Sequence, residues 1–379
     1  MGVLPYRQIH HEIIAMKILC VSGSPILNSK LDRGWGGSFS IPKILQSMHD
    51  NHGAEIVYLE MRLQKHADKY IHPHGRESYF DKPWGVLQLP PITGSDFSLD
   101  NFLLFLEYLI LDGDFDCVFL MEHTHLPQIV KKIRSVSVIP ILWYELDAIT
   151  QGVIDSYKES LGFIDAIVAA EGPTAAHSIA AGCPEEKCHI VLNGADPSVF
   201  YPLDGCRKTI LGSFVGNRNK NRDGYLDSMF FGPARALPEY KFMLRGNHYD
   251  QELTLNIGRS GPVMQNELNL IYNSSSLNVA AHLDRWESCP MVTGQKVFEI
   301  MASGSVVISH DTVGMREIVE HGVDGFLVNT PEEALAIYRK VAVSPEIVDG
   351  MGVRAREKII GTHTVDHRVN EIMQIAGSL

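Results

Sequence analysis

The chain has 379 residues, 45% of them apolar and 21% charged, which is the balance of an ordinary globular protein with enough residues for two domains. The net charge of −12 argues against sequence-independent binding to nucleic acids, which requires a basic surface. No apolar run reaches the roughly 20 residues of a membrane-spanning helix, and Lys17 interrupts what would be the core of a signal peptide. The six cysteines form no C-x-x-C pair, so we expect buried thiols in a reducing, cytoplasmic compartment.

The first two hundred residues alternate between strand and helix patterns. Residues 1–15 form an extension, and residues 62–98 are a long irregular loop rich in proline and glycine. Strands are predicted at 16–22, 54–59, 116–120, 138–143, 166–169 and 190–192, and helices at 40–51, 102–111, 126–133, 154–161 and 174–181. This alternation predicts βαβ units and therefore a parallel sheet.

A turn-rich stretch at 193–202 ends this first series, and a second one begins after it. Strands are predicted at 213–217, 241–244, 277–280, 306–309 and 326–328, and helices at 225–236, 267–272, 297–302, 331–341 and 366–374. The pattern predicts two α/β domains joined near residue 202. A ligand cleft between two such domains is the default expectation.

Residues 295–309 are the most informative segment of the chain. They predict a short amphipathic helix that carries one acid, Glu299, and ends at Gly304 before a buried strand. Residues 322–328 repeat this order of turn and strand. In an open parallel sheet, an acid at this place can face a ligand at the carboxyl edge of the strands.

Three segments resemble the GT-B glycosyltransferases of group 1 (family 4), and they occur in the family's order. They are the glycine pair Gly36 and Gly37, the linker 182–202, which follows G-x-P-x-x-K-x-x-V-x-x-N-G-V-D-x-x-x-F-x-P with two changes, and the region 294–325. Segments 214–217, 296–299 and 363–369 resemble the spore-maturation-type branch. The resemblance implies an α/β GT-B fold, with two Rossmann-like domains whose parallel sheets face a central cleft.

The resemblance also implies the domain limits and their roles. Residues 16–202 would form the acceptor domain and residues 203–362 the nucleotide-sugar donor domain, while residues 363–379 would pack back on the first domain. The implied donor-binding residues are Gly37, Gly216, Arg218, Lys220, Arg222, Gly294, Lys296 and Glu299.

The chemistry of a nucleotide-sugar donor fits these residue types. A diphosphate needs cations or backbone N–H groups, because negative charge builds on the leaving phosphate. Lys296 lies at the start of a predicted helix, where a cation opposes the helix dipole unless an anion is bound. Glu299 corresponds to the family glutamate that accepts hydrogen bonds from both ribose hydroxyls, and burying it unpaired would be costly.

The catalytic candidates are His123, Asp147 and Glu287. His123 and Asp147 follow two strands of the first domain, where proton transfer to an acceptor could occur. Most family members carry a second glutamate at the position of Met291, and the nearby Glu287 is the candidate replacement. Solvated loops or capping roles would explain each of these residues equally well.

The leading hypothesis is a retaining glycosyltransferase that moves a sugar from a nucleotide-diphosphate sugar to a hydroxyl acceptor, which could be a glycan, a lipid or a small molecule. No metal is expected, because the Asp112-Gly113-Asp114 turn precedes a strand and so faces away from the ligand edge. A sugar-nucleotide epimerase and a degenerate GT-B protein that only binds a nucleotide or a partner stay open. A nicotinamide oxidoreductase is the weakest alternative, since G-x-G-x-x-G is incomplete. The sequence leaves the oligomeric state undetermined.

Overall fold

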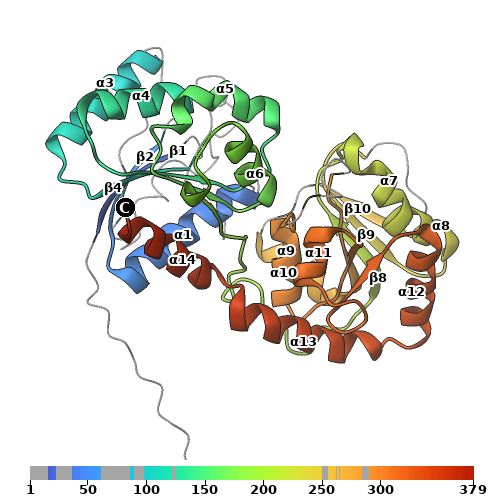
Figure 1. The fold of residues 1–379 in the computed structure, drawn as a ribbon. Helices are drawn as coiled ribbons and strands as arrows, with labels where there is room; N and C mark the ends of the chain where they lie inside the picture. Colours follow the sequence, from blue (N-terminus) through green and yellow to red (C-terminus); the bar gives the residue numbers. More distant parts are fainter. Residues whose placement is uncertain are drawn as a thin grey trace, which may run out of the picture.

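The computed structural model shows two α/β domains side by side (Figure 1). It describes residues 16–22, 36–60, 86–88, 98–121, 125–249, 255–261, 263, 265–283, 289 and 291–379. No helix in these ranges has both the length and the apolar character that crossing a membrane requires.

The first domain is built on a seven-stranded parallel sheet of order β3-β2-β1-β4-β5-β6-β7. Its strands are β1 (Lys17–Ser22), β2 (Glu55–Glu60), β3 (Val86–Gln88), β4 (Cys117–Leu120), β5 (Ile141–Glu145), β6 (Ala166–Ala169) and β7 (Cys188–Ile190). β4, β5 and β6 are buried along their whole length, as expected for parallel strands covered on both faces.

Helices cover both faces of this sheet. They are α1 (Gly36–His52), α3 (Leu99–Asp112), α4 (Leu126–Val136), α5 (Gln151–Leu161) and α6 (Gly172–Ala180), with a 3₁₀ turn η2 (Glu185–Lys187) before β7. One apolar core lies under α3, α4 and α5, and the other lies under α1 and the carboxy-terminal helix α14 (Val365–Gly377).

The second domain has a six-stranded parallel sheet of order β10-β9-β8-β11-β12-β13. Its strands are β8 (Ile210–Val215), β9 (Phe242–Arg245), β10 (Ile257–Ser260), β11 (Ser275–Ala280), β12 (Val307–His310) and β13 (Gly325–Val328). Its helical segments are η3 (Lys220–Arg222), α7 (Asp223–Leu226), η4 (Asp227–Phe231), α8 (Gly232–Ala236), α9 (Gln265–Ser274), α10 (Gln295–Ala302), α11 (Val313–Ile318), α12 (Pro331–Val343) and α13 (Ile347–Thr362). The α/β, GT-B-like arrangement predicted from the sequence is confirmed by the comparisons below.

The structure differs from the sequence predictions at several elements. α1 begins at Gly36, so Gly36 and Gly37 lie in its first turn and not in the loop before it. The predicted helix 225–236 is interrupted by the π turn η4, whose next residues include Pro233, which has no backbone N–H to continue the α pattern. β10, α11 and the short β3 were not predicted at all.

The chain passes between the domains twice. After α13 it returns to the first domain, where α14 packs against α1 and places Val369 and Ile372 in the core (Figure 1). The hydroxyl of Ser47 donates a 2.6 Å hydrogen bond to Asp366 of α14. The two crossings lie together, because Ala195 forms an isolated β-bridge with Thr364.

Candidate functional site

Polar side chains gather at the carboxyl edge of the second sheet, where β8 and β11 are neighbours. The strand order reverses at this pair, because the chain runs outward from β8 to β9 and β10 and then returns to β11. Open α/β sheets bind ligands outside the carboxyl ends of strands at such a point. The residues that follow β8, β11 and β12 therefore define the candidate site.

Glycines allow close approach at this edge. Gly294, which precedes α10, has a φ of 67°, in the left-handed region that favours glycine. A Cβ on Gly216, directly after β8, would lie 3.3 Å from the Lys296 Nζ and 3.0 Å from the Phe214 ring. A side chain at Gly216 would therefore crowd Lys296.

Lys296 lies in the first turn of α10 and is half-buried. Its Nζ lies 4.3 Å from the centroid of the Phe214 ring, a cation–π contact. Burial, and after it the positive charge of Arg222, lowers the pKa of Lys296 to about 7, while Glu299 opposes this shift. An anion beside Lys296 would restore the charged form of the amine.

Glu299 lies one turn further along α10 and is only 8% exposed. The Tyr272 hydroxyl donates a 3.4 Å hydrogen bond to its Oε2. Burial raises the pKa of Glu299 to about 7, against the opposing effects of Lys296, Gln295 and Tyr272. The carboxylate is thus incompletely compensated and can accept further hydrogen bonds.

Arg222 and His282 complete this group, which we call the carboxyl-edge cluster: Arg222, His282, Lys296 and Glu299. The Nε of Arg222 and the Nε2 of His282 are buried, and neither has a hydrogen-bond partner among the residues that the structure describes. Burial, then Lys296 and Arg222, lowers the pKa of His282 to about 4, so its imidazole is neutral at neutral pH. Buried polar atoms are nearly always satisfied, so unsatisfied ones at this edge of the sheet mark a place where a polar ligand could bind.

A hollow of about 400 Å³ lies beside the carboxyl-edge cluster, at the ends of β12 and β13. Lys220, Arg222 and His310 are among its lining residues. Both ring nitrogens of His310 are buried and lack a hydrogen-bond partner in the described part of the chain, and burial, followed by the charge of His282, lowers the pKa of His310 to about 3. His282 and His310 were not predicted as site residues, although each follows a predicted strand.

The remaining predicted donor residues are placed differently. Arg218 donates from Nη2 to Asp223 at 3.0 Å, so part of its charge is already compensated. Lys220 is exposed and only lines the hollow. Gly37 lies in the first turn of α1, in the other domain. The structure thus brings Arg222, Lys296 and Glu299 together more closely than the rest.

Two of the three catalytic candidates, His123 and Glu287, lie outside the described residues. Asp147 is exposed and follows β5 at its carboxyl end. Its backbone N–H donates to Glu145 Oε1 at 3.1 Å. Its role therefore stays a prediction.

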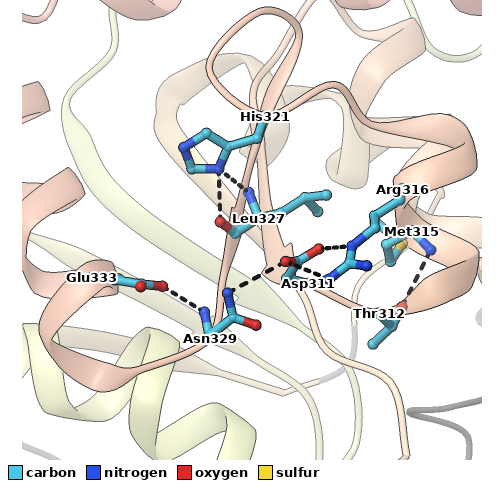
Figure 2. Close-up of polar contacts among 8 residues, drawn as sticks. All are labelled: Asp311, Thr312, Met315, Arg316, His321, Leu327, Asn329 and Glu333. Atoms are coloured by element: carbon cyan, nitrogen blue, oxygen red, sulfur yellow. Dashed lines mark hydrogen bonds and ion pairs between the residues drawn. The ribbon is translucent and has the colours of Figure 1, made fainter.

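A second and larger hollow, of about 830 Å³, is lined by residues that follow β12 and β13. Figure 2 shows its polar groups bonded to one another. Asp311 accepts from Arg316 through both carboxylate oxygens, and it also accepts from Asn329 at 3.3 Å. The Asn329 N–H donates to Glu333, and His321 bonds the backbone of Leu327. In the part of the chain that is described, no group of three or more histidine, cysteine or acidic side chains could hold a metal ion.

Comparisons with known proteins agree with this architecture. Residues 221–374 match the protein family described as glycosyl transferase-like. HepE from Anabaena, solved with UDP-glucose, superposes with a TM-score of 0.69 at 15% identity over 96% of this chain and 100% of that chain. Sucrose-phosphate synthase from Thermosynechococcus elongatus gives 0.67 at 13% identity over 96% and 98%. TarM gives 0.71 at 9% identity over 97% and 100%.

No curated protein matches the chain by sequence. The structural likenesses extend over nearly the whole chain and confirm the GT-B fold. Together with the family match in the second domain, they also confirm the resemblance to GT-B glycosyltransferases that the linker and the α10 region indicated.

Proposed function

We propose that this GT-B chain is a glycosyltransferase that moves a sugar from a nucleotide-diphosphate sugar to a hydroxyl acceptor. The observation that carries the proposal is the grouping of the half-buried Arg222 and Lys296 with the buried Glu299 at the carboxyl edge of the second sheet, where the charges of Arg222 and Glu299 both act on Lys296. Two neighbouring cations that are partly withdrawn from water are unfavourable until an anion arrives, and a diphosphate is an anion of suitable charge.

The cations would act most strongly on the leaving group. As the bond from the sugar to the phosphate breaks, negative charge builds on the phosphate oxygen, and Arg222 and Lys296 are positioned to stabilise that charge. The effect is larger in a buried site, where solvent screens charges less. The neutral His282 imidazole, whose Nε2 lacks a partner among the described residues, can donate or accept one further hydrogen bond there.

Glu299 would hold the ribose. A carboxylate accepts hydrogen bonds from two neighbouring hydroxyls, and Tyr272 fixes one of its oxygens from the other side. With the pKa of Glu299 near 7 in the empty site, a bound ribose would favour the ionised form. Ribose binding would therefore lower the pKa of this carboxyl group.

The finer features of the reaction are inferred from the similarity to solved structures and from the resemblance to family 4. HepE binds UDP-glucose in its solved complex, which supports a UDP-sugar as the first donor to test. Retention of configuration and independence of metal follow from the resemblance to family 4. The acceptor would enter from the first domain, where Asp147 is a candidate base at the carboxyl end of β5. Six free cysteines, with Cys20 and Cys117 fully buried, support a reducing, cytoplasmic compartment.

Nucleotide binding tests the proposal directly. Purified protein is heated with UDP, GDP or ADP, and the unfolding temperature is measured. A nucleotide at a hundred times its Kd should stabilise the native state by about 2.7 kcal/mol. If none of the three nucleotides raises the unfolding temperature, the proposal is wrong.

The role of Glu299 has its own test. Wild-type protein should bind UDP about tenfold more tightly than 2′-deoxy-UDP, because the deoxy nucleotide lacks one hydroxyl that the carboxylate accepts. Glu299→Gln should lose most of this preference, as measured by calorimetric titration. An unchanged preference in Glu299→Gln would place the ribose elsewhere.

A protein that binds the nucleotide without catalysis is the second candidate. Met291 occupies the position at which family 4 members carry an acid, so no carboxylate is supplied from that position. Its backbone has a left-handed φ of 54°. The two candidates differ in turnover. Release of free sugar from UDP-glucose that requires Arg222 would favour the transferase, whereas tight UDP binding without hydrolysis or transfer to any acceptor would favour the binding protein.

A further inference from the structure

A carboxylate from the first domain lies on the backbone of the candidate site. Glu171 follows β6 and precedes α6, and it is only 5% exposed. Its Oε1 accepts from the Gly294 N–H at 2.8 Å, and its Oε2 accepts from the Thr293 N–H at 3.0 Å. Both amides belong to the turn that leads into α10, so one side chain joins the two domains at the candidate site.

Further bonds across the domains surround this contact. The Gly172 N–H donates to the Met291 carbonyl at 2.9 Å. The Gln295 side chain donates to the Gly194 carbonyl at 2.8 Å. Glu171 also receives a 3.4 Å hydrogen bond from Asn193 within its own domain. The turn at 291–295 is therefore held against the first domain by a small set of bonds with Glu171 at the centre.

The amides that Glu171 occupies are the ones that an anionic ligand would use. Backbone N–H groups at a helix N-terminus bind phosphate well, and a carboxylate is the side-chain group closest to phosphate in this respect. Each N–H group makes one strong hydrogen bond, so the Gly294 amide cannot serve Glu171 and a donor phosphate at the same time.

We propose that Glu171 is an internal competitor of the donor: its carboxylate holds the Thr293 and Gly294 amides in the empty cleft, and the diphosphate of the incoming nucleotide displaces it. The inference rests on the proposed function. Displacement would release the contact between the domains, so donor binding and the relative movement of the domains would be one coupled event. Glu171 thereby sets the affinity for the donor without belonging to the donor domain.

The electrostatics of Glu171 agree with a contact that can be displaced. Burial is the main cause that raises its pKa to about 7, and nearby Asp147 adds to this effect. The two amide hydrogen bonds and Asn193 offset only part of the burial. The ionised carboxylate of Glu171 is therefore less stable in this site than in water. A diphosphate needs correspondingly less binding free energy to displace it.

Calorimetric titration of UDP into two variants tests the inference. Glu171→Gln removes the charge, and Glu171→Asp keeps the charge on a side chain one methylene shorter that cannot reach both amides. Both variants should bind UDP about tenfold more tightly than wild type, since each weakens the competing contact. The matched control is Glu185→Gln in η2, an exposed acid of the same domain, whose UDP affinity should equal that of wild type.

The outcomes separate the inference from the function it rests on. If wild type binds UDP and both Glu171 variants bind it equally or more weakly, the competitor role is wrong and the transferase proposal stands. If only Glu171→Gln gains affinity, the effect is one of charge alone, and the competitor role is again wrong. If neither wild type nor a variant binds UDP, GDP or ADP, the proposed function fails.

Small-angle X-ray scattering supplies a readout that needs no nucleotide. Without UDP, Glu171→Gln and Glu171→Asp should show a larger radius of gyration than wild type, because the bonds that hold residues 291–295 to the first domain are weakened. Addition of UDP should bring wild type to the domain arrangement of the variants. Identical scattering from all the proteins, with and without UDP, would contradict the coupling.

Discussion

Two groups of charged side chains lie at the same edge of the second sheet, and they differ in how well their polar atoms are satisfied. In the carboxyl-edge cluster, buried nitrogens of Arg222 and His282 have no hydrogen-bond partner within the described ranges. In the group of Figure 2, Asp311, Arg316 and Asn329 bond one another near the surface. The larger hollow belongs to the second group. We therefore base the candidate site on unsatisfied buried atoms and not on volume.

The largest expected effect comes from removing the half-buried cation. Lys296→Met should lower the affinity for UDP by about a hundredfold or more, since a half-buried partner of the diphosphate is lost. The matched control is Arg316→Met, in the hydrogen-bonded group of Figure 2. The UDP affinity of this variant should stay within about twofold of wild type. Calorimetric titration measures both. Equal losses of UDP affinity in the two variants would show that the difference between the two groups does not determine UDP binding.

One glycine near each of the two groups allows a second comparison, because replacing the two glycines by alanine should destabilise the protein to different extents. A Cβ on Gly246, which has a φ of 145°, would lie 2.1 Å from the Gly216 carbonyl oxygen. Gly246→Ala should therefore lower the free energy of unfolding by about 2 kcal/mol or more. Gly322, beside His321, has a φ of 78° and open space around its Cβ position.

Gly322→Ala should lower the free energy of unfolding by only about 1 kcal/mol, because only the left-handed backbone is penalised. Urea denaturation of the two variants measures the difference. A loss for Gly322→Ala as large as that for Gly246→Ala would mean that the contact with Gly216 adds nothing.

The pH dependence of stability should report the buried acid. The pKa of Glu299 is raised from 4.5 to about 7, so the native state binds more protons than the unfolded state between these values. The contribution of Glu299 is therefore present below about pH 4.5 and is lost as the pH rises to about 7, by an amount on the order of 3 kcal/mol. Lys296 keeps its proton over most of this window, because its pKa is also about 7.

Glu299→Gln should reduce this loss and leave the part that comes from Glu171, whose pKa is also raised to about 7. The measurement is urea denaturation of both proteins at several values between about pH 5 and about pH 7. Asp311→Asn serves as the control from the other group, because Arg316 is the main cause that lowers the pKa of Asp311, so that acid titrates at lower pH. A slope in Glu299→Gln that equals the wild-type slope would assign the loss to another group.

The smallest expected effect is that of chelation. We expect EDTA to leave both UDP binding and sugar release from UDP-glucose unchanged, because protein cations, in place of a metal ion, would neutralise the diphosphate. Binding is measured before and after dialysis against EDTA. Loss of binding that added magnesium or manganese restores would require a metal in the site.

The sequence predicted the features that depend on local pattern. Hydrophobic periodicity and turn residues predicted the strands around Glu299, whereas Arg222 was predicted from the resemblance to the spore-maturation-type branch. Glu171 was missed, because its partners Thr293 and Gly294 lie more than a hundred residues away and no local pattern joins them. A signal did exist: Glu171 is an acid between Ala170 and Gly172 at the end of a predicted buried strand.

Irregular elements were also beyond prediction. β10 contains Gly258 and Arg259 and is only four residues long, so neither its composition nor its length indicates a strand. It lies at the edge of the sheet and depends on pairing with β9. His282 shows a similar limit, because Lys296 and Arg222, whose charges lower its pKa, approach it only in the folded domain.

The return of α14 to the first domain has a consequence for synthesis on the ribosome. Val369, Ile372 and Met373 fill one core of the first sheet, whose strands end at residue 190. α1 covers part of that face, but the part under α14 stays uncovered while the entire second domain is translated. The nascent first domain therefore exposes apolar surface until the last residues of the chain are made. A prematurely terminated product would keep this surface exposed and would be expected to bind chaperones.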